Sequence, residues 1–364
     1  MAIKLLALAS LFPLHIWASP AGDSRPHGEC KQLNVSVTAS SHGYKFDIPR
    51  VDNDIDATAW ALNFDTWSNK PMPEPVLQNT TISGTYNIHA QICTPKSGGD
   101  VLQIATHGAY YDGRYWDAKL EGHSYVNAAL EAGYSILTYD RLGTGLSDHP
   151  DAYTVVQAQY ELEILRELTM MARSGAFGVQ PKKIVHVGHS FGSIVSTAFI
   201  ATYPDLSDGA IITGYVLNKY LGAVGRSSWS VQHSAGWPSG YVTMQKSGIH
   251  STFFGGGFTS DLLDYGDAIK SPTAVAEITS GGFLVMASGP FKGPIHYILP
   301  ELDFFICAGD CKNVTSLEAL QHTFPNASAI QLDIQPNTGH ALPLHKNATA
   351  GFQVSFDFLN KHGL

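Results

Sequence analysis

The most informative stretch of this chain is Val185-His186-Val187-Gly188-His189-Ser190-Phe191-Gly192. It places the pattern Gly-X-Ser-X-Gly between a short apolar segment and a segment with helical spacing, the context in which this pattern forms a sharp strand-to-helix turn. On such a turn the serine hydroxyl projects above the sheet, and side chains at the two glycines would clash with neighbouring backbone. The pattern therefore makes Ser190 a candidate nucleophile.

Segments with strand and helix patterns alternate on both sides of this stretch. Short apolar runs predict strands, and apolar residues three to four positions apart predict helices. The expected strands are 101–106, 134–139, 184–187, 210–216, 295–299 and 329–334, and the expected helices are 123–131, 153–173, 191–202, 316–323 and 348–361. This alternation indicates an α/β fold with a mostly parallel sheet and right-handed crossovers.

Other regions depart from the alternation. Residues 217–290 are rich in Gly, Ser and aromatic residues, and we interpret them as a cap inserted into the domain, with the three glycines at 255–257 as a loop or mobile connection. Upstream, we expect an edge strand at 33–38, a longer strand at 83–94 and irregular structure over the Asn-, Asp- and Pro-rich residues 41–80. The expected organisation is a signal peptide at 1–19, a core at 20–216, the cap at 217–290 and the rest of the core at 291–364.

A nucleophilic serine needs a base, and the base needs a carboxylate to orient it. Where this serine pattern occurs, the acid and then the histidine follow it along the chain. His340 comes just after the last expected strand, where a loop could return it to the serine, so we favour it over His345, which lies at the approach to the final helix.

Three acidic residues are candidates for the carboxylate. Asp303 follows the expected strand that ends at 299, and Asp310 would replace it if residues 304–308 were themselves the strand. We favour Asp303 because the Gly-Pro pair at 293–294 opens a better strand, and because a bridge between Cys307 and Cys311 would tie Asp310 into a turn. Glu301 is the third candidate.

Backbone amides are the expected source of an oxyanion hole, which stabilises the negative charge of a tetrahedral intermediate. One amide is that of Phe191, at the positive end of the helix after the serine. The other is expected from the loop after strand 101–106, where Gly108 lets the backbone turn and Ala109 follows.

With these residues in place, the chain resembles the α/β-hydrolase superfamily, and it is similar to the secreted fungal serine hydrolases of that superfamily. The resemblance covers 83–216 and 291–364 and leaves out the cap. Besides the serine turn and the His-Gly pair at 107–108, the similar stretches are Ser83-Gly84-Thr85-Tyr86-Asn87-Ile88, Tyr139-Asp140-Arg141-Leu142-Gly143-Thr144-Gly145-Leu146-Ser147 and the segment from Asp303 to Cys311. One departure is Pro300, where members of the superfamily commonly have glycine.

The resemblance implies an α/β-hydrolase fold, a mostly parallel sheet flanked by helices with an inserted cap. It also implies hydrolysis of carboxylic esters through an acyl-enzyme on Ser190, with Asp303 and His340 completing a triad and no metal or organic cofactor. The aromatic cap favours an apolar or aromatic small-molecule substrate. Asp140 and Arg141 are expected to hold the loop beside the site. Other acyl chemistry (an acyltransferase, a peptidase or a carbon–carbon bond hydrolase) and a non-catalytic binding protein remain alternatives.

Composition excludes other classes of function. The chain has 364 residues, of which 44% are hydrophobic and 15% charged, so it can bury a large core. Lys and Arg number 22 against 31 Asp and Glu, an acidic balance that argues against a nucleic-acid partner. Beyond the N-terminus no apolar run reaches the length of a membrane span, so no stable membrane anchor is expected. The sequence gives no prediction of oligomeric state.

Several features predict secretion. Lys4 precedes an apolar run and small residues at 18–19, which is typical of a signal peptide. The four cysteines form an even set, and we favour the pairs Cys30–Cys93 and Cys307–Cys311 among three possible pairings. Sequons for N-glycosylation occur at Asn34, Asn79, Asn313, Asn326 and Asn347.

Overall fold

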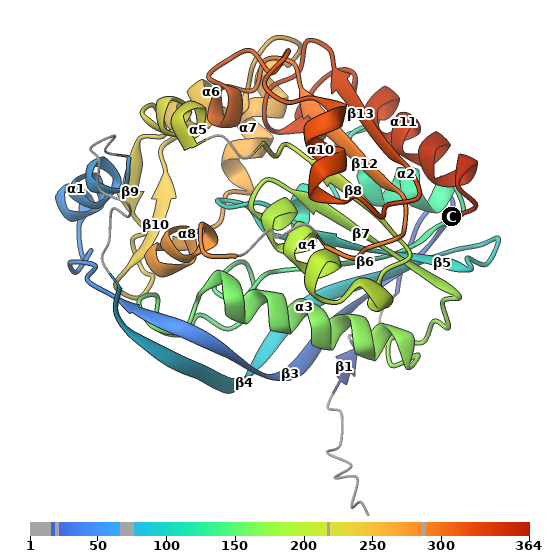
Figure 1. Cartoon of the computed structure of the whole chain (residues 1–364), viewed down its shortest axis with the longest axis horizontal. Helices are drawn as coiled ribbons and strands as arrows, with labels where there is room; N and C mark the ends of the chain where they lie inside the picture. Colours follow the sequence, from blue (N-terminus) through green and yellow to red (C-terminus); the bar gives the residue numbers. More distant parts are fainter. Residues whose placement is uncertain (1–15, 19–21, 66–75, 217–218, 285–288) are drawn as a thin grey trace, which may run out of the picture.

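A computed structural model describes residues 16–18, 22–65, 76–216, 219–284 and 289–364. Its main sheet has the strand order β1-β3-β4-β6-β5-β7-β8-β12-β13, with β2 pairing on β3 (Figure 1). The strands are β1 (Ile16–Ala18), β2 (Asp23–Ser24), β3 (Gly28–Phe46), β4 (Val76–Pro95), β5 (Val101–Thr106), β6 (Ser135–Tyr139), β7 (Lys183–His189), β8 (Gly209–Thr213), β12 (Ile295–Pro300) and β13 (Ile330–Gln335). The run from β6 to β13 is parallel, whereas β1 to β4 are antiparallel.

Helices cover both faces of the parallel strands, which explains why β6 and β8 consist entirely of buried residues. On one face α3 (Ala158–Arg173) packs against α4 (Phe191–Thr202), and on the other α2 (Tyr125–Glu131) packs against α11 (Ala348–Lys361). The buried stripe of α3 contains the residues that gave it helical spacing, Leu162, Leu165, Leu168 and Met171. Shorter helices follow β12, namely α9 (Phe304–Cys307) and α10 (Leu317–Thr323), and single 3-10 turns lie at Gly113–Tyr115, Pro204–Leu206 and Leu342–Leu344.

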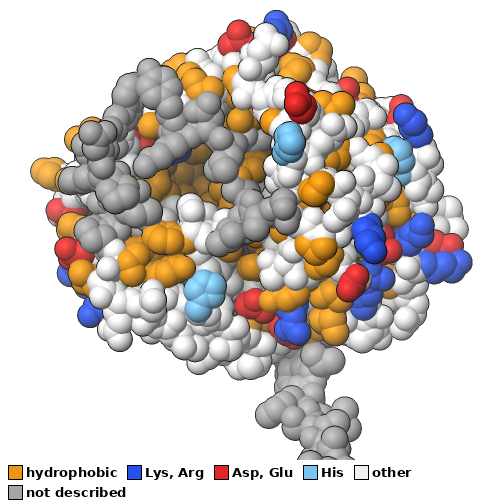
Figure 2. All heavy atoms as spheres, viewed as in Figure 1, with side chains coloured by type: hydrophobic (Ala, Val, Ile, Leu, Met, Phe, Trp, Pro, Cys, Tyr) orange, Lys and Arg blue, Asp and Glu red, His pale blue; other side chains and the backbone are white. Residues whose placement is uncertain are grey.

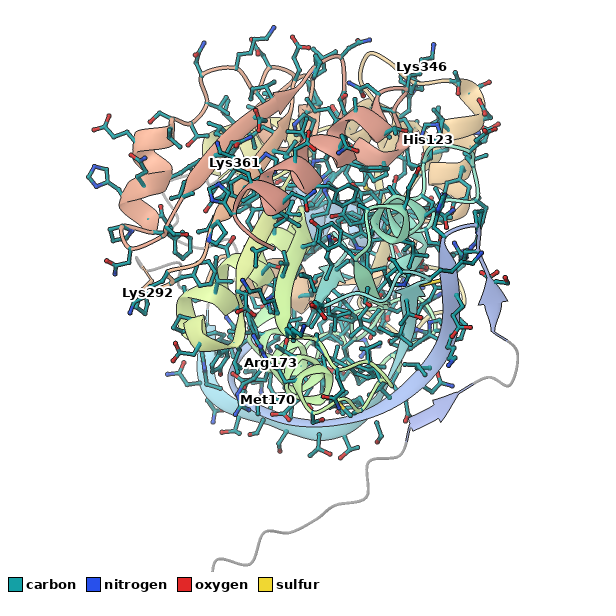
Figure 3. All side chains as sticks on the ribbon, turned by 90° about the vertical axis from the view of Figure 1, so that its right-hand side faces the viewer. His123, Met170, Arg173, Lys292, Lys346 and Lys361 are labelled. Carbon is teal, nitrogen blue, oxygen red and sulfur yellow. A yellow bond between two sulfur atoms is a disulfide. The ribbon has the colours of Figure 1, made fainter. Side chains whose placement is uncertain are left out.

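The antiparallel strands β3 and β4 are much longer than the sequence predicted. Their register runs without a break from Gly28 opposite Pro95 to Lys45 opposite Gln78. Figure 3 shows this ribbon curving around α3, near whose end Met170 and Arg173 lie. The expectation of an edge strand at 33–38 was wrong for 33–35, which pair with β1, whereas no described strand pairs with 36–38 on that side of β3.

The prediction of irregular structure over 41–80 was also wrong. Besides parts of β3 and β4, this region forms α1 (Asp54–Phe64), and 66–75 lie outside the described residues. The polar residues that suggested a loop begin the helix instead: the Asn53 side chain accepts hydrogen bonds from the amides of Ile55 and Asp56. Asp54 and Asp56 then place negative charge on its first turn, where the helix dipole favours it.

The segment 219–284, between β8 and β12, forms an insertion with a small antiparallel sheet of its own, in the order β11-β10-β9. Its elements are α5 (Lys219–Arg226), β9 (Val231–His233), β10 (Tyr241–Met244), α6 (Lys246–Phe253), α7 (Ser260–Ala268), β11 (Thr273–Ala274) and α8 (Val275–Gly281). Helix α1 packs against β9, so α1 lies beside the insertion although in sequence it falls between β3 and β4 of the main sheet. Figure 2 shows a hollow between α5 and α8 with hydrophobic side chains on its visible floor.

Two disulfides link the same cysteine pairs that the sequence favoured. Cys30 and Cys93 are directly opposite each other on β3 and β4. Cys307 ends α9, and the turn through Ala308 and Gly309, both with positive φ, brings Cys311 back to it. Of the predicted signal peptide, only β1 is described, and no helix among the described residues has the length and apolar character to cross a bilayer.

The Cys30–Cys93 bridge predicts a measurable difference in stability. Replacing both cysteines with alanine frees a loop of 63 residues in the unfolded chain, which in the chain-entropy account lowers the free energy of unfolding by about 4 kcal/mol. The matched control replaces Cys307 and Cys311, which close only 4 residues and are expected to cost about 2 kcal/mol. Urea denaturation measures both, and an equal loss in the two variants would contradict this account.

Candidate active site

Ser190 occupies a strained turn between β7 and α4. Its backbone has φ 53° and ψ −118°, a conformation that non-glycine residues rarely adopt. The flanking glycines allow this turn because a Cβ at Gly188 would lie 2.7 Å from the Gly192 carbonyl oxygen, and one at Gly192 would lie 2.1 Å from that of Thr106. The Ser190 amide donates to the Thr213 carbonyl of β8 at 2.9 Å. The hydroxyl is therefore fixed at the carboxyl edge of the parallel strands.

His340 and Asp303 complete a hydrogen-bonded chain with this serine. His340 lies in the loop after β13, with its Nε2 2.8 Å from Ser190 Oγ and its Nδ1 2.5 Å from Asp303 Oδ2. The exposed fractions are 7% for Ser190, 1% for His340 and 0% for Asp303. A carboxylate beside Nδ1 favours the tautomer with the proton on Nδ1, which leaves Nε2 free to accept the serine proton.

Of the three candidate acids, Asp303 is the one that contacts His340. Residues 304–307 form α9 and not a strand, and Asp303 caps that helix, with its Oδ1 accepting from the Ile306 amide at 3.0 Å. Asp310 is exposed and accepts from the Lys312 amide instead. Glu301 pairs with Lys312 and accepts from the Asn337 amide.

The departure at Pro300 leaves the acid turn intact. Pro300 is the last residue of β12, and its carbonyl accepts from the Asp303 amide at 3.4 Å. Since a proline at the end of a strand gives up only its own amide, the chain can still turn towards Asp303.

His345, the other candidate base, is buried and shapes the loop that carries His340. Its Nε2 accepts from the Gly339 amide at 2.9 Å, and its Nδ1 donates to the Ala341 carbonyl at 2.9 Å. This bonding requires the neutral ring. Burial lowers the pKa of His345 to about 4, against a smaller opposing effect of its bonds to Ala341 and Gly255.

Acid should therefore destabilise the fold through His345. Between pH 6.5 and 4 the unfolded chain binds a proton at this residue and the folded chain does not, so stability falls as the pH is lowered. Urea denaturation at pH 7 and 4.5 should show that His345→Gln loses about 2 kcal/mol less than the native chain over this interval. Equal losses in the two proteins would show that the fold does not hold His345 neutral.

The three glycines at 255–257 lie in a loop, which was one of the two interpretations of this stretch, and this loop packs against the loop that carries His340. The Gly257 amide donates to the Asn337 carbonyl at 2.8 Å, and Gly256 forms a β-bridge with Thr338. A Cβ on Gly339 would lie 2.4 Å from the Gly255 nitrogen. The glycines allow this close approach of two backbones, which fixes the loop that carries His340.

The two predicted oxyanion amides flank the serine. Phe191 follows Ser190 directly, and a Cβ on Gly108, the residue before Ala109, would lie 2.8 Å from the Ser190 Cβ. Neither the Ala109 nor the Phe191 amide donates to an acceptor among the described residues. Both amides are thus free for a ligand.

Aromatic rings surround the catalytic histidine candidate, a feature that the sequence indicated only as an aromatic-rich cap. The ring centres of Phe253 and Phe305 lie 4.9 and 5.0 Å from that of His340. Trp229 continues this wall, with its ring centre 6.3 Å from Phe305 and 5.9 Å from Tyr110. These rings come from α6, α9, the turn between α5 and β9, and the loop after β5, so sequence separation hid the cluster.

Comparison with known proteins identifies the family. The model of the alpha/beta hydrolase family matches residues 104–351, which span the serine turn, the insertion and the His340 loop. The chain belongs to the alpha/beta hydrolase family. No curated protein sequence matches this alpha/beta hydrolase.

Solved structures share the fold of this alpha/beta hydrolase at low sequence identity. A thermophilic esterase from Thermogutta terrifontis has 16% identity and a TM-score of 0.53, over 77% of this chain and 95% of its own. An alpha/beta hydrolase from Penicillium sp. sh18 has 18% identity and a TM-score of 0.50, over 76% and 94%. An epoxide hydrolase from Vigna radiata has 12% identity and a TM-score of 0.52, over 76% and 95%. These likenesses establish the fold, and the reaction has to be argued from the site.

Proposed function

We propose that this alpha/beta hydrolase cleaves carboxylic esters through an acyl-enzyme on Ser190. The observation that carries the proposal is the hydrogen-bonded chain from Ser190 through His340 to Asp303. Ser190 Oγ attacks the ester carbonyl while His340 Nε2 takes its proton, and the alcohol leaves with that proton. Water then adds to the acyl-enzyme by the same route and releases the acid. Asp303 stabilises the imidazolium formed in each half of the reaction.

The amides of Ala109 and Phe191 are proposed to bind the oxyanion. Their lack of an acceptor among the described residues supports this role, because buried amides without partners are costly unless a ligand uses them. Phe191 also begins α4, whose dipole favours negative charge at that end. Loss of one such donor typically slows turnover by about 10²- to 10³-fold.

The substrate is proposed to be an apolar or aromatic small-molecule ester. The rings of Phe253, Phe305 and Trp229 support this assignment, since Phe253 and Phe305 pack on His340 and Trp229 packs on Phe305, which places apolar surface next to the catalytic histidine candidate. The insertion that supplies Trp229 and Phe253 is proposed to act as the cap over the site.

We further propose that the chain is secreted and glycosylated. Two disulfides support an oxidising compartment. Of the sequon residues, Asn347 differs, because its amide nitrogen donates to the Pro336 carbonyl and its oxygen accepts from Thr338. Glycans are therefore proposed on the exposed residues Asn34, Asn79, Asn313 and Asn326.

Covalent labelling combined with product analysis tests the function. A fluorophosphonate probe should label Ser190, and the label should be lost in His340→Ala. Hydrolysis of aromatic and aliphatic p-nitrophenyl esters in ¹⁸O-water should place one ¹⁸O atom in the released acid. Ester exchange with an added alcohol in place of acid release would identify an acyltransferase. Opening of styrene oxide without ester cleavage, or no labelling of folded protein, would contradict the proposal.

A further inference from the structure

Arg141 connects the two segments that carry the oxyanion amides. It follows β6 and is 1% exposed. Its Nε donates to the His107 carbonyl at 3.0 Å and an Nη to the Gly108 carbonyl at 3.3 Å. The guanidinium carbon also lies 4.8 Å from the ring centre of Phe191. One side chain thus contacts both the loop before Ala109 and the residue after Ser190.

Two buried carboxylates hold this guanidinium from different parts of the fold. Glu161 of α3 lies 2.5 Å from the Arg141 Nη1, and Glu277 of α8 forms a second ion pair with the same nitrogen. The exposed fractions of their side chains are 3% and 0%. Burial raises the pKa of the Glu161 carboxyl, and Arg141 opposes this effect. A buried guanidinium is stable only when it is paired, and its planar fork fixes the direction of each bond.

Helix α8 of the insertion also packs against Phe191 and the start of α3. A Cβ on Gly281 would lie 2.9 Å from the Phe191 ring, so the helix and the ring are in close contact. The Ser280 hydroxyl accepts from the Ala158 amide at 2.9 Å and so caps the start of α3. Helix α8 is therefore docked on the core through Phe191, α3 and Arg141.

His107 adds a neutral hydrogen-bonded link between Arg141 and the loop. Its Nδ1 donates to the Gly108 carbonyl at 2.8 Å, and its Nε2 accepts from the Arg141 amide at 3.0 Å. Burial and then the charge of Arg141 lower the pKa of His107 to about 3. The loop before Ala109 is thus bonded to both the backbone and the side chain of Arg141.

We infer that Arg141 is a positioning residue for the oxyanion hole and that Glu277 makes α8 of the insertion part of its support. The inference rests on the function proposed above. The amides of Ala109 and Phe191 come from separate segments, and donors stabilise an oxyanion only when their spacing is fixed before the reaction. Arg141 fixes that spacing, and Glu277 fixes Arg141.

The test compares Arg141→Lys, Glu277→Gln and Glu277→Ala in the full-length protein. We expect kcat for a p-nitrophenyl ester to fall about 10- to 100-fold for Arg141→Lys and Glu277→Ala, with KM changed less than about threefold, as for an interaction made only in the transition state. Affinity for a trifluoromethyl ketone, which forms an oxyanion on Ser190, should fall in parallel. Glu277→Gln keeps the size of the side chain and should retain more activity than Glu277→Ala.

Asp117→Asn is the matched control, because Asp117 is also buried against an arginine, Arg25 at 2.7 Å, and has no described contact with the triad or with residues 107–109. The Asp117→Asn variant should unfold at a lower denaturant midpoint and leave kcat and ketone affinity unchanged.

If Arg141→Lys and Glu277→Ala had the same kcat and ketone affinity as the native protein, the contacts of Arg141 and Glu277 would serve stability alone. A raised KM with native kcat would assign them to substrate binding instead. If the native protein hydrolysed none of the esters, the proposed function would be overturned. If the native protein were active and the Arg141 and Glu277 variants matched it, this inference alone would be overturned.

Discussion

Ser190→Ala and His340→Ala are each expected to lower kcat for ester hydrolysis by about 10⁴- to 10⁶-fold. The two residues act as one unit across the 2.8 Å bond between Ser190 Oγ and His340 Nε2. Without the hydroxyl no acyl-enzyme can form, and without the imidazole the hydroxyl keeps its proton. The double variant should therefore be no slower than either single variant. Stopped assays with a p-nitrophenyl ester measure the rates, and circular dichroism measures the fold.

Ser196→Ala is the control for the serine. Ser196 lies on the same helix, α4, and its buried hydroxyl has no partner among the described side chains, so its loss should leave activity intact. If Ser190→Ala kept more than about a hundredth of the native activity, the acyl-enzyme route would be excluded, since triad serines contribute far more than this.

Asp303→Asn is expected to lower kcat by about 10⁴-fold, because an amide in this position no longer favours the Nδ1 proton on His340. Asp310→Asn should keep activity within about threefold of the native protein, since the Asp310 side chain is exposed and, among the described residues, accepts a hydrogen bond from the Lys312 amide alone. The comparison is informative because the two residues are close in sequence, but only Asp310 lies within the turn closed by the Cys307–Cys311 bridge. A severe loss in Asp310→Asn with a mild loss in Asp303→Asn would reverse the assignment of the acid.

The sequence predicted the residues now found at the ends of the parallel strands because their positions follow from local patterns. Ser190 lies between an apolar run and a helix, and Asp303 and His340 each follow a strand. Helices α4 and α11 have the predicted bounds, whereas α3 begins at Ala158 and not at 153, because residues 153–157 precede the helix as turn and coil.

The interactions that the sequence did not predict join residues far apart in the chain. Glu161 and Glu277 look like ordinary charged helix residues, and no local pattern indicates that both meet Arg141 in the interior. The glycines at 255–257 suggested flexibility because glycine permits both mobile loops and close backbone contacts. Only the partner loop at 337–339, about eighty residues further along, distinguishes these two uses.

The glycine contact also limits how the protein can be re-engineered. Because Gly256 bridges to Thr338 and Gly257 donates to Asn337, the insertion is not a detachable module that could be exchanged for that of a relative to alter substrate choice. A segment taken from a relative would need glycines at the positions of 255–257. Without them its backbone could not approach the loop at 337–339, and we expect His340 to lose its alignment with Ser190. Libraries of insertion variants should therefore preserve 255–257 and Glu277, so that the contacts with the His340 loop and with Arg141 stay intact.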